Sequence, residues 1–429
     1  IVHLAQPLVG RVHGGLAAIN VQASPMLSGV AGAATAQAAA IGGVMNREML
    51  RAPHQQGFFT RVLDHERRPK AGFDAVKRHF GQRVPLRRRS PAAPARRSAP
   101  GAGAEEGHAV VLTAHGGPEN LAWQRVSAPA PGEGEVRIRQ SAVGVNFIDV
   151  YCRTGYFPLL EPPGVLGMEA AGTVVDVGPG VAGLSPGDRV AYAGPPLGAY
   201  AEVRTLPADL VVALPPGLDE ATAAAGLLKG LTAEFLLHRV HAVREGDWVL
   251  VHAAAGGVGS LLCQWASQLG ARVIGTVGSR EKARQAAANG CAHPILYREE
   301  DFVARVREIT GGAGCDVIYD AIGRDSVARG VEALALRGHV VSYGQAAGPL
   351  EPFDLAGLAS KSGRVSRPNY GHYAGTREQV AAGSRRLFAA LERGVLTVEI
   401  GLRLPLREAA EAHRRLEARE TAGSTVLVV

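Results

Sequence analysis

Three small residues, Ala254, Gly256 and Gly259, have the spacing of the turn in a dinucleotide-binding motif, with Ala in place of the usual first Gly. Small residues let backbone N–H groups approach a pyrophosphate, and the N-terminus of a following helix adds partial positive charge. The apolar residues 248–251 before the turn predict a buried parallel strand. Apolar residues after the turn recur on one face of a helix that Gly270 would end. Strand, turn and helix in this order predict a bound dinucleotide rather than an ordinary tight turn.

The end of the second expected strand, residues 272–277, indicates which dinucleotide binds. An NAD site places Asp or Glu there to bind the ribose 2′-hydroxyl. This sequence instead has Ser279, Arg280 and Lys282. Hydroxyl groups and cations suit a 2′-phosphate, so we expect NADPH rather than NADH. The alternative is that Arg280 and Lys282 form only a solvated first helical turn.

Charge is distributed unevenly along the 429 residues. Residues 1–106 contain 15 Lys+Arg against 6 Asp+Glu, a net charge of +9, whereas the remainder contains 31 against 33, a net charge of −2. The nearly neutral remainder gives no indication of nucleic-acid binding. No apolar stretch is long enough to span a bilayer. The four cysteines show no close pairing, which predicts reduced thiols and a cytoplasmic protein.

Residues 1–107 differ in kind from the rest of the chain. They are rich in Ala, Gly, Pro and Arg, carry basic residues at 87–89 and 96–97, and end in a linker-like stretch, PAAPARRSAPGAGAEEG. We expect disorder here. Four interpretations remain: a disordered tail, an organelle-targeting segment, a basic nucleic-acid-binding arm, or upstream sequence foreign to the natural protein. Acidic residues argue against a transit peptide, which favours the first or the last.

Two different patterns of expected strands and helices follow, and together they predict an α/β protein. Residues 108–230 suggest a compact β-rich domain, with strands near 136–139, 171–177, 188–193 and 199–203 and a helix at 147–153. Residues 231–370 alternate between strands (249–253, 272–277, 294–297, 316–319, 339–343) and helices (including 281–289 and 301–310), which is typical of a doubly wound parallel sheet. Residues 371–429, with a helix at 376–393 and a strand at 424–429, are expected to return to the first domain.

Stretches in a fixed order from residue 108 onward, among them NFIDVYCRTG, LGMEAAGTVVDVGPGV, LLKGLTAEFLL, HAAAGGVGSLLCQWA, ITGGAGCDVIYDAIGRD and GSTVLVV, carry a family resemblance. The chain resembles the quinone oxidoreductases, the zeta-crystallin-like branch of the medium-chain dehydrogenase/reductase superfamily. The resemblance implies a GroES-like catalytic domain, a Rossmann NADP-binding domain and a homodimer joined through the nucleotide domains. It leaves residues 1–106 unexplained.

A catalytic zinc is not expected. Zinc alcohol dehydrogenases of this superfamily use a Gly-His-Glu histidine as a ligand, and this chain has Gly167-Met168-Glu169. A thioether is a poor zinc ligand beside imidazole or thiolate. Asp149 falls near the place of the ligand cysteine, and no four-cysteine lobe is present. Glu169 is then expected to bind backbone or a nearby cation.

The resemblance also implies a set of site residues. Tyr151 is the candidate for placing the acceptor or donating a proton, with Asn146 and Lys229 as supports; helix capping by Asn146 and simple packing of Tyr151 are the alternatives. The implied cofactor-binding residues are Asp149, Thr232, Ala254, Gly256, Gly257, Val258, Gly259, Gly278, Ser279, Lys282, Tyr297, Tyr343, Gly344, Gln345, Arg367, Asn369 and Arg419.

The expected function is NADPH-dependent reduction of a quinone in the cleft between the domains, without a metal. No residue couple suited to strong acid–base catalysis falls on a matched motif, and a reduced quinone can take protons from solvent. One alternative is an NADPH-dependent enone or alkenal reductase. Another is a nucleic-acid-binding protein that uses the basic residues 87–97.

Overall fold

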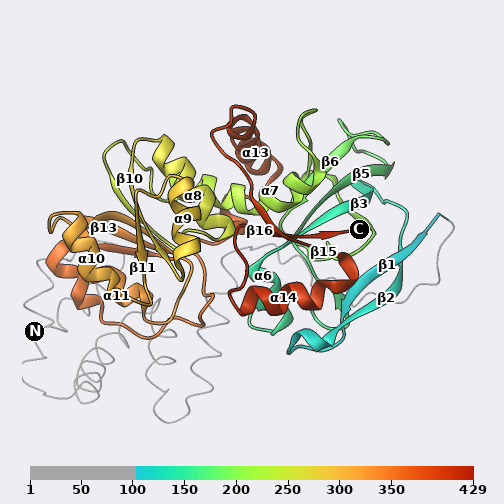
Figure 1. Cartoon of the computed structure of the whole chain (residues 1–429). Coiled ribbons are helices and arrows are strands. Elements are labelled where there is room, and N and C mark those ends of the chain that lie inside the picture. Colours follow the sequence, from blue (N-terminus) through green and yellow to red (C-terminus); the bar gives the residue numbers. More distant parts are fainter. Residues whose placement is uncertain (1–102) are drawn as a thin grey trace, which may run out of the picture. The chain divides into compact units, whose positions relative to one another are not determined.

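A six-stranded parallel sheet forms the nucleotide domain in this computed structural model, which describes residues 103–429 (Figure 1). The strand order is β11-β10-β9-β12-β13-β14, the doubly wound arrangement whose order reverses between β9 and β12. All adjacent pairs run parallel. The strands are β9 (Trp248–His252), β10 (Arg272–Val277), β11 (His293–Leu296), β12 (Cys315–Asp320), β13 (Leu334–Ser342) and β14 (Arg364–Ser366).

The first helix of this domain begins at the glycine-rich turn of the predicted dinucleotide-binding motif. Val249, Leu250 and Val251 of β9 are fully buried, as predicted for a parallel strand covered on both faces. Gly270 follows the first helix with φ +83°, a conformation that favours glycine. The helices are α8 (Gly257–Gln268), α9 (Arg280–Ala288), α10 (Phe302–Ile309) and α11 (Ser326–Glu332).

The β-rich domain contains a three-stranded sheet and a seven-stranded sheet. The first comprises β1 (Glu105–Leu112), β2 (Leu121–Ala128) and β4 (Gly164–Val165). The second comprises β3 (Glu135–Val145), β5 (Glu169–Val177), β6 (Arg189–Ala193), β7 (Val203–Pro207), β8 (Val211–Ala213), β15 (Ile400–Pro405) and β16 (Ser424–Val428). Helix α6 (Phe147–Arg153) follows β3 directly, at the predicted position.

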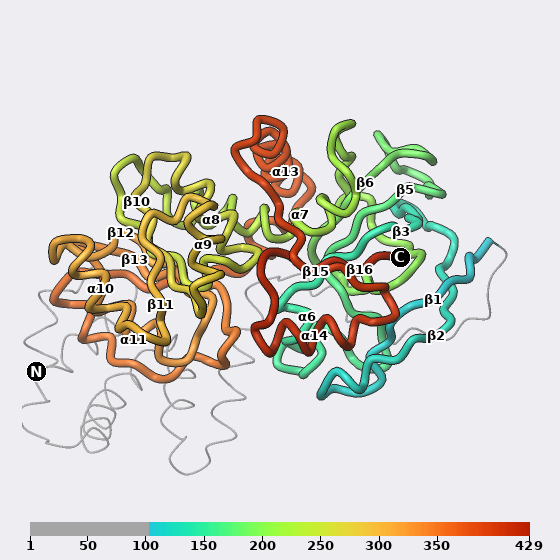
Figure 2. The backbone as a smooth tube through the Cα atoms, in the orientation of Figure 1, coloured from blue at the N-terminus to red at the C-terminus, as the bar shows by residue number. Residues whose placement is uncertain are grey.

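The chain returns to this second sheet at its C-terminus. After the helices α12 (Tyr370–Tyr373), α13 (Arg377–Glu392) and α14 (Ala409–Glu417), β16 pairs antiparallel with β3, with Val426 opposite Gly144. Figure 2 shows the red C-terminal strands beside the cyan-green strand β3. A backbone bridge between Gly256 and Gly423 also brings the returning chain against the dinucleotide turn.

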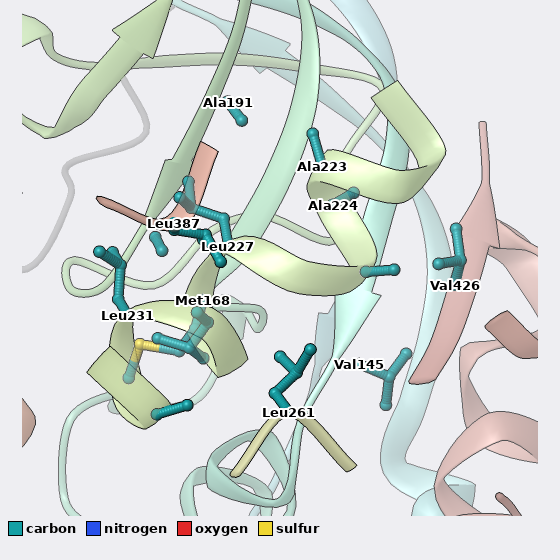
Figure 3. Close-up of a cluster of buried hydrophobic side chains, with 14 of the residues drawn as sticks. Val145, Met168, Ala191, Ala223, Ala224, Leu227, Leu231, Leu261, Leu387 and Val426 are labelled. Atoms are coloured by element: carbon teal, nitrogen blue, oxygen red, sulfur yellow. The ribbon is translucent and has the colours of Figure 1, made fainter. Parts of the chain in front are cut away.

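Helix α7 (Glu220–Phe235) crosses between the domains and fills the core. Its N-terminus is capped by Asp219, which accepts a 2.9 Å hydrogen bond from the Thr222 N–H. Figure 3 shows its Leu227 and Leu231 in one buried cluster with side chains from both domains. Replacing such a buried leucine with alanine costs about 2–5 kcal/mol, so α7 is a main structural link between the domains.

The expected fold class is confirmed, with differences in detail. The strand expected at 199–203 is wrong, because strand β7 begins only at Val203. Gly198 has φ +137°, which turns the chain before this point. The N–H groups of Ala199 and Tyr200 then bond the carbonyls of Gly167 and Leu166. The first strand begins at Glu105, ahead of the expected start of regular structure at residue 108.

Sequence reasoning did not identify α7, β14, β15 or α14. The disorder expected for residues 1–107 lies almost wholly outside the described residues. Within 103–429, no helix is long and apolar enough to cross a membrane.

Candidate cofactor and acceptor site

A cavity of about 1160 Å³ runs between the two domains. Side chains of α6 and α7 line one part of the cavity. The carboxyl ends of β9, β10, β12 and β13 line another part, and residues between 416 and 425 of the C-terminal return segment complete it. Ligands of doubly wound folds bind at this edge of the sheet, where the strand order reverses. The cavity therefore lies where the dinucleotide motif predicted a ligand.

The turn between β9 and α8 has no room for side chains. A Cβ on Gly259 would lie 2.2 Å from the Ala253 carbonyl oxygen, and one on Gly257 would lie 2.7 Å from Cδ of Lys229. Gly256 stands at the N-cap, so the N-terminus of α8 opens into the cavity. Ala254 is buried beneath the turn, where its N–H bonds the Thr276 carbonyl, and does not line the cavity.

Basic side chains gather beyond β10. Ser279 caps α9, and its Oγ accepts a hydrogen bond from the Lys282 N–H. The Lys282 ammonium donates to the Arg419 carbonyl at 2.7 Å, which ties α9 to the return segment. Burial raises the pKa of Tyr297, but hydrogen bonds with Arg298 and Arg419 outweigh it and lower the pKa overall.

Lys282, Arg298 and Arg419 all line the cavity beside Ser279, and no carboxylate stands at the tip of β10. Sequence reasoning missed Arg298, although it directly follows the predicted Tyr297. Arg280 does not line the cavity: its side chain is 79% exposed and lies 3.3 Å from Glu299. The solvated first turn is therefore the correct description of Arg280 but not of Lys282.

Tyr151 projects from α6 into the cavity at its other end. Its hydroxyl oxygen accepts a 2.8 Å hydrogen bond from the Gln345 N–H, which leaves the phenolic proton free to donate. Burial raises the pKa of Tyr151 to about 12, so the phenol stays protonated at neutral pH. Gln345 itself lines a smaller neighbouring cavity, where the Tyr156 hydroxyl donates to its Oε1 at 2.5 Å.

Asn146 and Lys229 are held by one carboxylate. Glu169 is fully buried, and its Oε1 accepts hydrogen bonds of 2.8 Å from both Asn146 Nδ2 and Lys229 Nζ. Its Oε2 accepts a bond from the Leu228 N–H at 2.7 Å. Glu169 thus has the structural role expected of it. Asn146 is also the N-cap of α6, where it forms a capping box with Asp149, so the capping alternative and the bond to Glu169 both hold.

Asp149 lies outside the cavity, although it was predicted to bind cofactor. It is completely buried, and its Oδ2 accepts hydrogen bonds from the Asn146 N–H at 2.8 Å and the Tyr200 hydroxyl at 3.2 Å. Burial, reinforced by nearby Glu169, raises the pKa of Asp149 to about 7. Asp320 is also buried and accepts hydrogen bonds from the N–H groups of Ile322 and Gly323.

The residues at the expected metal position do not fit a zinc ion. Met168 supplies a thioether to the cavity wall, and both oxygens of Glu169 are already engaged. Among residues 103–429, no group of three His, Cys, Asp or Glu side chains could hold a metal.

Most residues expected at the site do meet around the cavity. They are Asn146, Tyr151, Lys229, Thr232, Gly256, Gly257, Val258, Gly259, Gly278, Ser279, Lys282, Tyr297, Tyr343, Gly344, Arg367, Asn369 and Arg419. Asp149, Ala254 and Gln345 do not line it. Other residues that line the cavity were not predicted from the sequence, because no short motif marks them. They include His252, Phe302, Arg329 and Tyr370.

Three family profiles match this chain. The alcohol dehydrogenase GroES-like domain matches residues 132–216, and the profile described as zinc-binding dehydrogenase matches residues 257–388. The third, the DctM component of tripartite ATP-independent periplasmic transporters, matches residues 1–63, outside the described part of the chain.

Curated relatives and solved structures cover the same region. A 2-haloacrylate reductase of Burkholderia is 45% identical over 75% of this chain and 98% of its own length. A quinone oxidoreductase of Pseudomonas aeruginosa is 46% identical over 74% of this chain and 98% of its own length. The structure of Escherichia coli quinone oxidoreductase complexed with NADPH aligns with a TM-score of 0.73 at 42% identity, covering 75% of this chain and all of that one. The chain therefore belongs to the quinone oxidoreductase family of enzymes, within the medium-chain dehydrogenase/reductase superfamily.

Proposed function

We propose that this enzyme reduces quinones with NADPH in the cavity between its domains, without a metal ion. The observation that carries this proposal is the cluster of Ser279, Lys282, Arg298 and Arg419 beyond β10, where a carboxylate would favour NADH. When bound, the reduced nicotinamide supplies a hydride. NADPH is also named in the structure of the Escherichia coli relative.

Each part of the cavity has a role in this proposal. The glycine turn and the N-terminus of α8 bind the pyrophosphate, and the basic cluster binds the 2′-phosphate. Residues at the other end orient the nicotinamide against the acceptor and exclude water; they are Thr232, Tyr343, Gly344, Arg367 and Asn369.

The acceptor lies beside Tyr151 in this proposal. Aromatic and aliphatic side chains line this end of the cavity, including Phe157, Met168 and Tyr370, which suits a planar apolar ring. The protonated Tyr151 hydroxyl holds an acceptor oxygen by hydrogen bonding. Asn146 and Lys229, fixed by Glu169, position neighbouring groups.

A second candidate is reduction of an activated alkene. The Burkholderia relative is named a 2-haloacrylate reductase, and Tyr151 offers a proton within the cavity. In this reaction a hydride adds to the β-carbon of an alkene conjugated with a carbonyl, and a proton adds to the α-carbon. The two candidates share the cofactor and differ only in the acceptor.

Two wider expectations remain proposals. We propose a cytoplasmic location, because all four cysteines are free and buried thiols, which suits a reducing compartment. We also propose a homodimer, by family resemblance alone. Nucleic-acid binding through residues 87–97 is disfavoured by the nearly neutral charge of the remainder of the chain.

The test is to titrate the purified protein with NADPH and NADH separately and follow fluorescence. Lys282→Ala should weaken NADPH binding by about 10–100-fold, the loss of a charge-assisted phosphate contact, and change NADH binding little. Arg280→Ala is the matched control, because Arg280 lies on the same helical turn but outside the cavity. A panel of benzoquinone, naphthoquinones and enones then identifies the acceptor class. Equal affinity of the wild type for both nucleotides would contradict the proposal.

A further inference from the structure

An ion pair between a buried arginine and a partly exposed glutamate joins the helix that carries Tyr151 to the helix that precedes Arg419. Arg153, the last residue of α6, binds Glu417, the last residue of α14, through two hydrogen bonds of 2.8 Å each. The Arg153 side chain is 2% exposed. Its Nε also donates to the Gly116 carbonyl at 3.0 Å. A buried guanidinium with this many partners fixes the geometry of the groups around it.

A hydrogen-bond chain with a defined direction connects this pair to the N-terminus of α6. Arginine can only donate, so Arg153 donates to His413 Nδ1 at 3.3 Å. Burial lowers the pKa of His413 to about 3, so its neutral ring carries the proton on Nε2 and donates to the Tyr200 hydroxyl oxygen at 2.9 Å. Tyr200 in turn donates to Asp149. Both ends of α6 are therefore attached to α14 through buried groups.

The same pair lies at the end of α14. Arg419 follows Glu417 by two residues and has φ +60°, the left-handed conformation that commonly ends a helix, with the Glu420 N–H bonded to the Arg415 carbonyl at 3.0 Å. The Arg419 carbonyl accepts the Lys282 ammonium, and both side chains line the basic end of the cavity. A displacement of the α14 terminus would move these two cations together.

We propose that Arg153 and Glu417 are positioning residues for nucleotide recognition: their two-pronged ion pair holds the end of α14 so that Arg419 and Lys282 face the 2′-phosphate subsite. Neither Arg153 nor Glu417 lines the main cavity, so both act through other residues. This inference rests on the proposed use of NADPH. It adds that preference for the 2′-phosphate depends on a contact between two helices outside the nucleotide sheet.

Removing one member of the Arg153–Glu417 pair should weaken binding at the end of the cavity that holds the 2′-phosphate. In Glu417→Gln the side chain keeps its shape but loses the charge opposite a buried guanidinium, which weakens the pair. The end of α14 is then free to shift, and small displacements of binding groups have large effects on affinity. Phosphate binding should suffer more than binding of the rest of the nucleotide, which contacts other elements.

The experiment measures dissociation constants for NADPH and NADH with four variants of the full chain. Glu417→Gln should weaken NADPH binding about tenfold and change NADH binding by less than about twofold. Arg419→Ala should act in the same direction, and the double variant should bind NADPH no more weakly than Arg419→Ala alone, because both changes remove the same contact. Glu411→Gln is the matched control: Glu411 is a carboxylate of similar exposure on the same helix, but it pairs with the exposed Arg414 and Arg415 instead of a buried guanidinium.

Equal weakening of NADPH and NADH binding by Glu417→Gln would mean a general structural role and would overturn the inference. Additive losses in the double variant would also overturn it. If Glu417→Gln does not fold, Arg153→Lys tests the same pair, because it keeps the charge but not the two-pronged geometry. A wild type without preference for NADPH overturns the proposed function and this inference together, whereas a wild-type preference retained in Glu417→Gln overturns the inference alone.

Discussion

Lys229 Nζ lies 2.8 Å from Glu169 Oε1, and both side chains are buried in the interior between the domains. The same carboxylate accepts hydrogen bonds from Asn146 on the N-terminal side of α6 and from the backbone of α7. One charged group on β5 therefore holds two helices in register. A buried carboxylate is costly unless it is paired, and this one is satisfied by three donors.

Glu169→Ala should consequently destabilise the protein strongly. It leaves the Lys229 ammonium buried without its partner, which typically costs about 3–5 kcal/mol. Denaturant unfolding would measure this loss as a lower free energy of unfolding. Glu220→Ala is the control, because its pair with Arg189 is partly exposed and should contribute at most about 1 kcal/mol. Similar losses in the two variants would contradict the role assigned to Glu169.

The buried Asp149 should make stability depend on pH. Its folded pKa, about 7, lies above the unfolded value of 3.8, so the folded state binds the extra proton between these limits. This contribution is fully present below about pH 4 and is lost as pH rises toward 7, by at most about 1.4 kcal/mol per pH unit. Asp149→Asn should therefore gain stability relative to wild type as pH rises. If the free energy of unfolding depends on pH in the same way for Asp149→Asn and the wild type, this role of Asp149 is refuted.

His413 should produce the opposite dependence. Burial lowers its folded pKa to about 3, below the unfolded value of 6.5, so stability is lost as pH falls between these limits. In the wild type, the stability lost through Asp149 as pH rises and the stability gained through His413 offset each other between about pH 4 and 6.5. Asp149→Asn should therefore show a steeper acid-side loss in thermal unfolding, and His413→Gln a shallower one.

Tyr151→Phe should separate the two candidate reactions. A proton delivered in the transition state is worth about 10²–10⁴ in rate, so kcat for enones should fall by that order if Tyr151 is the donor. Quinones take protons from solvent and should lose much less. Tyr156→Phe is the matched control, because Tyr156 also contacts Gln345 but lines only the smaller cavity. An unchanged kcat with every acceptor would remove Tyr151 from the mechanism.

Chelation should leave turnover intact. Met168 is a weak zinc ligand, and Glu169 is already bound by Lys229 and Asn146. Dialysis against EDTA, followed by metal analysis and assay with NADPH, should retain activity within error. Activity lost on dialysis and restored by zinc would require a ligand set that residues 103–429 do not provide.

The sequence predicted those parts of the site that local chemistry encodes. The glycine turn, the missing acid after β10 and the basic residues that follow it lie within short stretches whose periodicity and residue types are informative. Arg298 was missed because no spacing rule marks it. The pair of Arg153 and Glu417 was missed because its members are 264 positions apart and meet only when the chain returns. Ala254 and Asp149 matched family positions, yet tight packing keeps both away from the cavity.

The pairing of β16 with β3 has a practical consequence for anyone who dissects this protein. Strand β16 lies between β15 and β3 in a sheet begun nearly three hundred positions earlier, so the β-rich lobe is encoded in two separate stretches with the nucleotide lobe inserted between them. A truncation before Ser424 would expose the edge of β3 and remove the strand that brings the chain past Gly256. Exchange of the nucleotide lobe between relatives would thus need two splice points.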